Sequence, residues 1–356
     1  MAQSEMNMAP INIRINPLGG AVIICFVLVL FFYVFGLPDF FSHREERVSM
    51  KELLSASVVL ARRGGDRVRE IRRGDTLQEK VKGETKEGAK ELVSRGDMES
   101  HNAIFYGLAK AFPGLYVVSE EHEKTPLDFS RIPDIDLHLK EVESQVLSDQ
   151  SIPKSEITVW IDPLDATQEY TEMTDADGSD MLHFVTTMVC VAVNGQPTIG
   201  VIHKPFVNND QGETTWAWVG YGHSDNLKKE RTKRTEDDPH RVIVSRSHQG
   251  TVTDTVKASL GKVDVSLAGG AGYKTLEVIK GNQDAYVHTT LIKKWDICAG
   301  NAILSSLDGK MTTLDGKHID YKSGDQAKNE GGLLATTFHH DSYLEKLAHL
   351  KDDEKH

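Results

Sequence analysis

The chain has 356 residues, which is enough for about two domains of ordinary size. Apolar residues make up 39% of it and allow a sizeable core, while 53 acidic against 41 basic residues leave a net charge of −12. This balance argues against binding to nucleic acid, whose phosphates select basic surfaces, and it suits acidic side chains that gather divalent cations.

The first forty residues differ from the rest because they contain a long apolar stretch. Between Ile15 and Phe41 only Asp39 carries a charge, and at about 1.5 Å per helical residue such a stretch crosses a bilayer core of roughly 30 Å. A cleaved signal peptide is the alternative, but the apolar part is too long for one and no A-x-A-like site follows. We expect a short tail at 1–17 and a transmembrane signal anchor at 18–38.

The charges that flank this stretch favour one orientation only weakly. Arg14 is the basic side chain before it, whereas Arg44, Arg47 and Lys51 lie just beyond it. By itself the positive-inside rule places the large domain in the cytosol.

The three cysteines say little about the compartment. Cys25 lies within the apolar stretch, and Cys190 and Cys298 lie in the apolar contexts VTTMVCVAV and WDICAGNAIL. These contexts favour buried free thiols. The sequence contains no Cys/His spacing typical of zinc and no N-glycosylation sequon.

Beyond the anchor, the pattern predicts two helices and a strand. Apolar residues recur at helical spacing over 50–73 and 98–112, and LYVVSEEH at 115–122 is typical of a short strand that ends in acids. We interpret the polar stretch 74–91 as a linker and the polar stretch 123–156 as an insertion between two strands.

The later part of the chain predicts a hairpin and then an alternating pattern. The stretch 182–205 contains two strands around an NGQP turn. The charge-rich run 222–240 is interpreted as a domain boundary, with a surface loop as the alternative. Strands and helices then alternate, which is typical of layered α/β domains. We expect an N-terminal α+β half at 48–225 and a C-terminal α/β half at 226–356.

One stretch, VWIDPLDATQEYTE at 159–172, sets two acids three residues apart at the end of a strand. Pro163 is expected to end that strand, and ATQEYTE to start a helix. Carboxylates bind hard cations, and helix N-terminal amides attract phosphate. The turn would bring both kinds of group into one small volume, from Asp162, Asp165, Ala166 and Thr167.

Bare carboxylates in such a cluster would repel one another. Two of them about 4 Å apart cost on the order of 4 kcal/mol at an effective dielectric near 20, so the cluster needs cations, and Mg²⁺ suits oxygen ligands. The alternative for this stretch alone is that Asp165 caps a helix and Asp162 lies in a turn. Asp97, Glu120 and Asp296 also lie at the ends of predicted elements. Helix caps and an exposed strand end would place them there as well.

Three motifs together resemble the lithium-sensitive, magnesium-dependent phosphatases typified by inositol monophosphatase. They are the strand followed by Glu120 and a second glutamate, D-P-L-D-A-T at 162–167, and W-D-x-x-A-G at 295–300, in the family's order. The resemblance covers roughly residue 49 to the C-terminus and implies a sugar-phosphatase-like αβαβα sandwich. One departure is Ala166, where the family usually has glycine, and its methyl group is expected to crowd the phosphate.

The resemblance also implies which residues bind metal. One Mg²⁺ would be held by Glu120, Asp162 and the backbone carbonyl of Leu164. A second would be held by Asp162, Asp165 and Asp296.

A third, weaker ion would face Asp97 and Glu120, so the site would hold two or three ions. Asp97 and Thr167 would orient the water that attacks phosphorus in line, without a covalent intermediate. The catalytic residues implied are therefore Asp97, Thr167 and Glu120.

The substrate is suggested by a narrower resemblance. QEYTE at 168–172, VIVSRSH at 242–248 and GGAGYK at 269–274 are similar to the family branch that converts 3′-phosphoadenosine 5′-phosphate to AMP and phosphate. By this resemblance the glycine turn and its lysine hold the second phosphate. As alternatives, such a glycine stretch is more often a plain turn, and a lone histidine is more often a surface residue. The substrate-binding residues implied are Ala166, Thr167, Ser245, Arg246, His248, Gly270, Gly272 and Lys274.

Together with this branch, the apolar N-terminal stretch resembles family members of the Golgi membrane, which have one span and a lumenal catalytic domain and act on a by-product of sulfation. That orientation conflicts with the charges around the span. Two rival functions stay open: an inositol monophosphate phosphatase, and a catalytically silent membrane protein that binds nucleotide or metal. The presence of all five acids and Thr167 argues against the silent protein. A homodimer is also left open.

Overall fold

The computed structural model describes residues 16–35, 45–74, 77–84, 90–122, 128–227, 238–246, 252–347 and 350. The chain forms two compact units, Met1–Glu46 and Arg47–His356.

The described part of the first unit is helix α1 (Pro17–Phe35), which has no charged residue in its first or last turn and exposes most of its large apolar side chains. Among the described residues, none of the helices has the length and apolarity needed to cross a membrane. The signal anchor expected at 18–38 is therefore not confirmed, and residues 36–38 lie outside the described ranges.

A six-stranded sheet is the centre of the second unit. Its order is β10-β9-β8-β7-β6-β4, in which β4 runs parallel to β6 and every other neighbouring pair is antiparallel. The expected hairpin is confirmed as β7 and β8, joined at Asn194 and Gly195, which both have positive φ. The strands are β4 (Tyr116–Ser119), β6 (Ile157–Asp165), β7 (Thr186–Val193), β8 (Gln196–Lys204), β9 (Glu213–Trp218) and β10 (Gly222–His223).

A second sheet of five strands follows along the chain, in the order β12-β11-β13-β17-β15. Strand β11 pairs in parallel with β12 and β13, and β17 is antiparallel to both of its neighbours. The strands are β11 (His240–Ser245), β12 (Val263–Ala268), β13 (Ala285–His288), β15 (Lys310–Thr312) and β17 (Leu333–Thr336).

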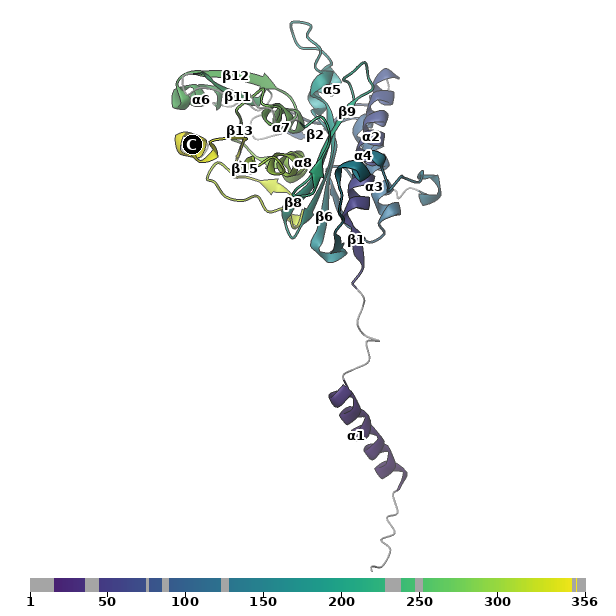
Figure 1. Cartoon of the computed structure of the whole chain (residues 1–356). Helices are drawn as coiled ribbons and strands as arrows, with labels where there is room; N and C mark the ends of the chain where they lie inside the picture. The colour runs from purple at the N-terminus through teal and green to yellow at the C-terminus, as the bar shows by residue number, and fades with distance from the viewer. Residues whose placement is uncertain are drawn as a thin grey trace, which may run out of the picture. The chain divides into compact units, whose positions relative to one another are not determined.

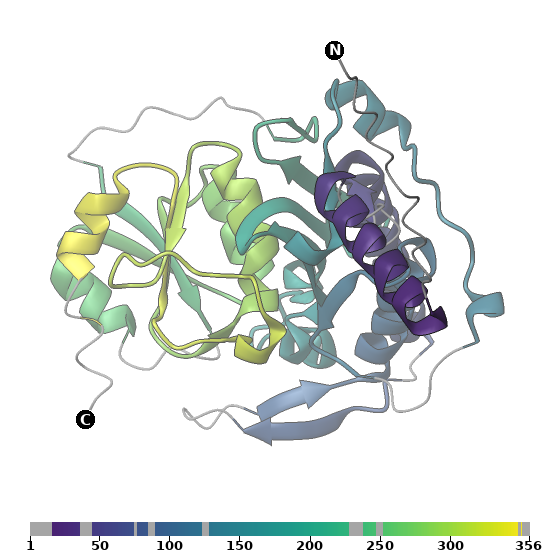
Figure 2. The ribbon, with the colours of Figure 1, turned by 90° about the horizontal axis from the view of Figure 1, so that it is seen from below.

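Helices cover both sheets and separate them. Figures 1 and 2 show α2 and α3 on one face of the six-stranded sheet, α7 and α8 between the sheets, and α6 and α9 on the far face of the five-stranded sheet, in agreement with the packing of these elements. The expected αβαβα sandwich is confirmed. The helices are α2 (Met50–Arg73), α3 (Arg95–Ala111), α6 (Val252–Leu260), α7 (Ala271–Ile279), α8 (Lys294–Ser305) and α9 (His340–Leu347). The proposed division near residue 225 stays a prediction, and it falls between the strands of the two sheets.

Apolar patterning explains which faces are buried. One core cluster lies between α2, α3 and the six-stranded sheet and includes Val159 and Ile161 of β6. A second includes Trp160 of the same strand together with residues of α7, α8 and the five-stranded sheet. Because alternate side chains of a strand point to opposite faces, Asp162 lies on the same face as Trp160, the one that α8 covers.

The described residues of this unit also form three short strand pairings and two short helices. The stretch 74–91, expected as a linker, instead contributes a hairpin, and the insertion at 123–156 contains a helix and a strand. Both had too few apolar residues to show a clear period. The pairings are β1 (Arg47–Ser49) with β5 (Ser151–Pro153), β2 (Lys80–Glu84) with β3 (Lys90–Val93), and β14 (Ile292–Lys293) with β16 (Lys328–Asn329); the helices are α4 (Lys140–Gln145) and α5 (Thr167–Glu172). Short 3₁₀ turns lie at Phe129–Arg131, Lys154–Glu156, Leu182–Phe184 and Gly324–Gln326.

For Cys190 and Cys298 the predicted burial is confirmed, but the prediction that they are free thiols is wrong. Cys190 of β7 and Cys298 of α8 form a disulfide, and both are buried. The apolar contexts did predict burial, but only the docking of α8 on the six-stranded sheet brings these two residues together.

Candidate metal centre and active site

Strand β6 carries Asp162, the central acid of the site, and is longer than the sequence predicts. Pro163 does not end the strand, which runs to Asp165. The register shifts between Asp162, which pairs with Met188, and Asp165, which pairs with Thr186, so one extra residue lies on β6. A proline fits such a bulge because its missing N–H is not needed for the ladder there. The bulge leaves Asp162 on the face covered by α8.

Three acids from distant parts of the sequence meet at this point. Glu120 follows β4, Asp162 lies in β6 and Asp296 lies in the first turn of α8, and one carboxylate oxygen of each lies within 4.8 Å of the other two. Asp162 is buried, and the other two are partly exposed. Oxygen ligands at this spacing fit a hard divalent cation such as Mg²⁺.

Burial and crowding raise the pKa values of these acids. The pKa of Asp162 is raised well above its usual range, first by burial and then by the charges of Glu120, Asp165 and Asp296. Burial also raises the pKa of Glu120 to about 7, against the opposing charge of Lys82. The pKa of Asp296 is raised as well, by burial and by the charge of Glu120. As anions, these groups therefore favour a bound cation.

Asp97 and Asp296 are helix caps in addition to candidate ligands. Asp97 Oδ2 accepts hydrogen bonds from the backbone amide and the hydroxyl of Ser94 at the start of α3, at 2.7 and 2.6 Å. Asp296 Oδ2 accepts from the amide of Lys293 at the start of α8, at 2.9 Å. Each cap fixes the direction of its carboxylate, so the cap and the ligand interpretations are compatible.

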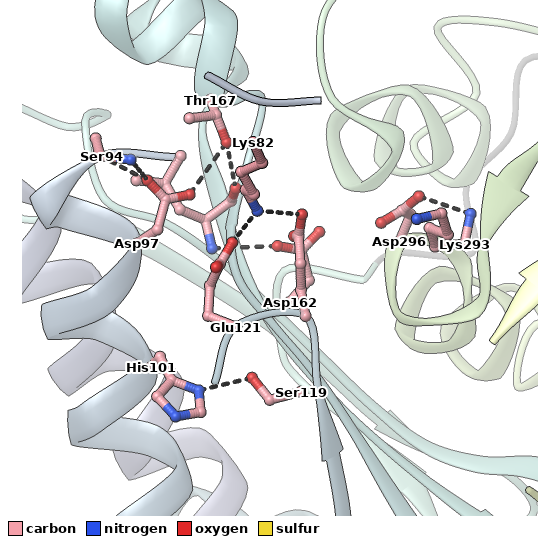
Figure 3. A network of polar contacts seen from close by, with 12 residues as sticks. Lys82, Ser94, Asp97, His101, Ser119, Glu121, Asp162, Thr167, Lys293 and Asp296 are labelled. Atoms are coloured by element: carbon pink, nitrogen blue, oxygen red, sulfur yellow. Dashed lines mark hydrogen bonds and ion pairs between the residues drawn. The ribbon is translucent and has the colours of Figure 1, made fainter. Parts of the chain in front are cut away.

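The pair expected to orient water is in contact. The hydroxyl of Thr167 lies 3.1 Å from Asp97 Oδ1 and 3.1 Å from the carbonyl oxygen of Leu164. Asp97 is fully buried, and burial raises its pKa to about 6 despite the hydrogen bonds from Ser94. Figure 3 shows Asp97 and Thr167 on one side of Asp162, with Asp296 approaching from the other.

Asp165 does not belong to the group of three acids. Its carboxylate accepts hydrogen bonds from the amides of Ala271 and Gly272 at the start of α7, at 3.1 and 2.8 Å, and from the hydroxyl of Thr186 at 3.2 Å. The alternative interpretation of Asp165 as the cap of the adjacent helix is wrong, because α5 has no side-chain cap and the carboxylate instead accepts from first-turn amides of the distant α7. Its role as a ligand of a second ion stays a prediction.

This contact explains the glycines of the stretch 269–272. A Cβ at Gly270 would lie 2.8 Å from Asp165 Oδ2, and the residue has a φ of +63°. A Cβ at Gly272 would lie 2.6 Å from Thr186 Oγ1. The glycines therefore allow α7 to approach Asp165, and their predicted contact with a phosphate remains untested.

Ala166 departs from the family pattern in a specific way. Its φ of +69° and ψ of +45° lie in the left-handed region, where residues with a Cβ are disfavoured. The backbone conformation, and not only the space near a phosphate, is therefore the physical reason for glycine at this position.

Lys274 and Ser245, both expected to contact the substrate, are buried. Lys274 is 3% exposed, its ammonium lies 3.4 Å from the carbonyl oxygen of Ala268 and 5.2 Å from the ring centre of Tyr286, and burial lowers its pKa against the charge of Asp165. Ser245 is buried at the end of β11. Their contact with a nucleotide stays a prediction, and His248 lies outside the described residues.

Arg246 has carboxylate partners on the segment that carries Thr167. Its guanidinium lies 3.2 Å from Glu169, 3.3 Å from Glu172 and 3.3 Å from Asp175. These ion pairs join the end of β11 to α5. The predicted contact of Arg246 with adenosine is not tested by them.

Two polar residues of the site were missed in the sequence. The ammonium of Lys82 on β2 lies 3.0 Å from Glu120 and also pairs with Glu121, as Figure 3 shows for Glu121. Burial would lower the pKa of Lys82, but these two charges outweigh it and the pKa is raised. Glu121 could have been found in the sequence, because it is the second glutamate of VSEEH. Lys82 could not, because it lies in the stretch that was interpreted as a linker.

Known proteins resemble this chain over nearly its whole length. The model of the inositol monophosphatase family matches residues 49–351. Inositol monophosphatase 3 from Danio rerio is 43% identical, covering 98% of this chain and all of that protein. Golgi-resident adenosine 3′,5′-bisphosphate 3′-phosphatase from Mus musculus is 41% identical, covering 97% of this chain and 99% of that protein. The two names refer to different substrates.

Solved structures support the fold. The extragenic suppressor protein suhB from Bartonella henselae superimposes with a TM-score of 0.59 at 20% identity, covering 83% of this chain and 96% of that chain. Inositol monophosphatase from Anabaena gives a TM-score of 0.57 at 19% identity, over 84% of this chain and 96% of that chain.

Proposed function

This chain belongs to the inositol monophosphatase family, and from that membership we propose that it removes the 3′-phosphate of 3′-phosphoadenosine 5′-phosphate, giving AMP and inorganic phosphate. As a member of this family it is a metal-dependent phosphoric monoester hydrolase that acts on small phosphate esters. The observation that carries the proposal is the convergence of Glu120, Asp162 and Asp296 within 4.8 Å. The nucleotide substrate is supported by the relatives named as bisphosphate 3′-phosphatases.

We propose Mg²⁺ as the metal, held by Glu120, Asp162 and Asp296, with the carbonyl oxygen of Leu164 and Asp165 as further ligands. When bound, Mg²⁺ would lower the pKa of the attacking water and neutralise charge on the leaving oxygen. The crowding of the acids supports this choice, since three carboxylates so close together are favoured as anions only beside a cation.

The chain's own groups would then position and activate the water. Asp97 accepts a hydrogen bond from the Thr167 hydroxyl, 3.1 Å away. The oxygen lone pairs of Thr167 would then accept a hydrogen bond from water. With a pKa near 6, Asp97 is largely ionised at neutral pH and can act as the acceptor. No covalent intermediate is needed for water to attack in line.

The nucleotide would lie toward the elements of the C-terminal half that adjoin α5. Ser245 and Arg246 end β11, and the ion pairs of Arg246 with α5 support a position beside Thr167. Gly270 precedes the neighbouring α7, and Gly272 and Lys274 lie on it, where Lys274 would supply positive charge for the second phosphate. His248 would complete the adenosine side.

We propose further that the catalytic unit lies in the Golgi lumen, attached to the membrane through the segment 18–38. The relatives named as Golgi-resident support the organelle. The Cys190–Cys298 disulfide supports the lumenal side, because disulfides persist in oxidising compartments and are rare in the cytosol. Protease treatment of sealed Golgi vesicles tests this orientation: protection of the domain after residue 47 is expected, and its digestion in intact vesicles would reverse the assignment.

A substrate panel tests the activity. The purified chain is given 3′-phosphoadenosine 5′-phosphate, AMP and inositol monophosphate in Mg²⁺, with and without Li⁺, and phosphate release is measured. Fastest release from the bisphosphorylated nucleotide, with inhibition by Li⁺, is expected. Faster release from inositol monophosphate would favour the rival phosphatase, and nucleotide binding without any release would favour the silent protein.

A further inference from the structure

The Cys190–Cys298 disulfide joins two layers of the sandwich. It connects β7 of the six-stranded sheet to α8, across 108 residues of sequence, with the two Cα atoms 5.7 Å apart. Both cysteines are buried, with exposures of 1% and 0%. Within the described part of the chain it is the covalent cross-link between the sheet and α8.

Each end of the disulfide lies next to a candidate metal ligand. Cys298 follows Asp296 by two residues in α8. Cys190 pairs in register with Trp160, which precedes Asp162 by two residues on β6 and points to the same face. Cys190, Cys298 and Trp160 belong to one core cluster. The disulfide therefore joins the turn of α8 that carries Asp296 to the strand beside β6, at the residue paired with Trp160, two residues before Asp162.

Non-covalent contacts also hold the first turn of α8: Ile297 is fully buried in the same core cluster, and the ring centre of Trp295 lies 6.4 Å from that of Trp160. Before this turn, β14 pairs with β16 over two residues, and the amide of Lys294 donates to the carbonyl oxygen of Ala327 at 2.8 Å. The Asp296 cap to Lys293 is internal to this turn. Repulsion between Asp296 and the acids Glu120 and Asp162 acts to move the turn away from the sheet.

We infer that the Cys190–Cys298 disulfide is a positioning element that holds Asp296 against Glu120 and Asp162, so that cleaving it weakens binding of divalent cations. This inference rests on the metal centre of the proposed function. A dithiol reductant would supply two electrons and two protons, converting the disulfide into two thiols while the dithiol becomes its own disulfide. The metal centre is then at full affinity only in an oxidising compartment.

Mn²⁺ binding to the full-length protein, followed by titration calorimetry, tests the inference without depending on turnover. The double variant Cys190→Ala/Cys298→Ala is expected to bind Mn²⁺ about tenfold more weakly than the oxidised protein. This factor is at the lower end of the losses of metal affinity seen when a group that supports a metal ligand is removed. Each single variant should show the same loss, because either one removes the same bond. An affinity within twofold of wild type in all three variants would overturn the inference.

A packing control separates positioning from general loss of stability. Ile303→Val shortens a fully buried side chain of α8 beyond the disulfide, and it should lower the melting temperature while leaving Mn²⁺ affinity unchanged. If this variant weakens Mn²⁺ binding as much as the cysteine variants do at equal loss of melting temperature, the disulfide has no special role.

If the alanine variants fail to fold, reduction of the disulfide in the wild-type protein tests the inference instead. The protein is treated with dithiol in mild denaturant and returned to buffer, and thiols labelled in full denaturant should then rise from one cysteine, Cys25, to three. Mn²⁺ affinity should fall about tenfold in the three-thiol form and recover on reoxidation. Unchanged Mn²⁺ affinity in the three-thiol form would refute this inference and leave the proposed function standing. Absence of Mn²⁺ binding in the oxidised protein, or binding that Asp162→Asn does not reduce, would instead remove the metal centre and the proposed function with it.

Discussion

Asp162 is the most enclosed of the three clustered acids, with 1% of its surface exposed. Its neighbours Glu120 and Asp296 come from the two sides of the site, so any ion bound by the cluster touches Asp162. Replacement by asparagine keeps the shape of the side chain and removes its charge. This residue therefore gives the sharpest test of the metal centre.

Asp162→Asn should lower turnover by more than about a hundredfold, because a direct ligand is lost rather than a supporting group. Its melting temperature without metal should not fall, since the substitution relieves repulsion. Phosphate release and thermal unfolding measure the two effects. The matched control is Asp264→Asn on the exposed edge of β12, which should leave both unchanged. Wild-type turnover in Asp162→Asn would contradict the assignment.

Ala166 provides a prediction about stability. Its left-handed backbone costs an alanine roughly 1–2 kcal/mol. Glycine avoids this cost, but its greater freedom in the unfolded chain offsets part of the gain. Ala166→Gly should thus stabilise the protein by about 0.5–1 kcal/mol and keep it active, as chemical denaturation and phosphate release would measure.

The matched control for this substitution is Ala176→Gly. Ala176 lies in a turn without positive φ, so the same change should stabilise nothing there. Equal effects of the two substitutions would show that backbone strain at Ala166 is absent.

At the scale of elements, the β2–β3 hairpin brings a cation to the acidic site. Lys82 is 26% exposed and pairs with Glu120 and Glu121, which otherwise repel each other. Lys82→Met should destabilise the metal-free protein by about 1–2 kcal/mol, less than for a fully buried pair because solvent screens part of the interaction. Mg²⁺ should restore part of this loss, because it supplies positive charge to the same acids.

Thermal unfolding in EDTA and in Mg²⁺ measures both effects. Lys80→Met on the same strand is the control, since Lys80 is exposed, and it should change neither value. A loss of stability in Lys82→Met that Mg²⁺ leaves entirely unchanged would show that the lysine does not balance the charge of the metal ligands.

The sequence predicts the long elements better than the short ones. Helices α2 and α3 and the β7–β8 hairpin were predictable because each repeats an apolar period over many residues. The β2–β3 hairpin has few apolar residues and no such period. Pro163 was wrongly expected to end β6, because a proline can occupy a bulge and a bulge depends on the partner strand.

The candidate site could be predicted as a set of acids but not as a geometry. Glu120, Asp162 and Asp296 were identified from their motifs, and the structure brings them together. The partner of Asp165 could not be predicted, because the amides that it caps lie more than a hundred residues away on α7. The disulfide was missed for the same reason, since its pairing depends on how α8 docks on the sheet.

For the whole molecule, the burial of the acids, together with their crowding, makes stability depend on pH in an unusual direction. The pKa of Glu120 is raised to about 7 and that of Asp97 to about 6, so the folded chain binds protons that the unfolded chain has already released. Folding stability therefore falls as pH rises from about 4 to 7. Ordinary paired carboxylates give the opposite slope.

In EDTA the protein should lose about 4 kcal/mol of stability between pH 5 and pH 8, since each unit of raised pKa above pH 5 is worth about 1.4 kcal/mol for Glu120 and for Asp97. Saturating Mg²⁺ should flatten this slope, because it stabilises the same carboxylates as anions. Thermal unfolding across this pH range, with and without Mg²⁺, measures the effect. Asp162→Asn should reduce the slope in EDTA by removing one of the repelling charges. If stability in EDTA instead rises steadily to pH 8, burial and repulsion do not disfavour the anions of these acids, and the physical reason for placing a cation among them is lost.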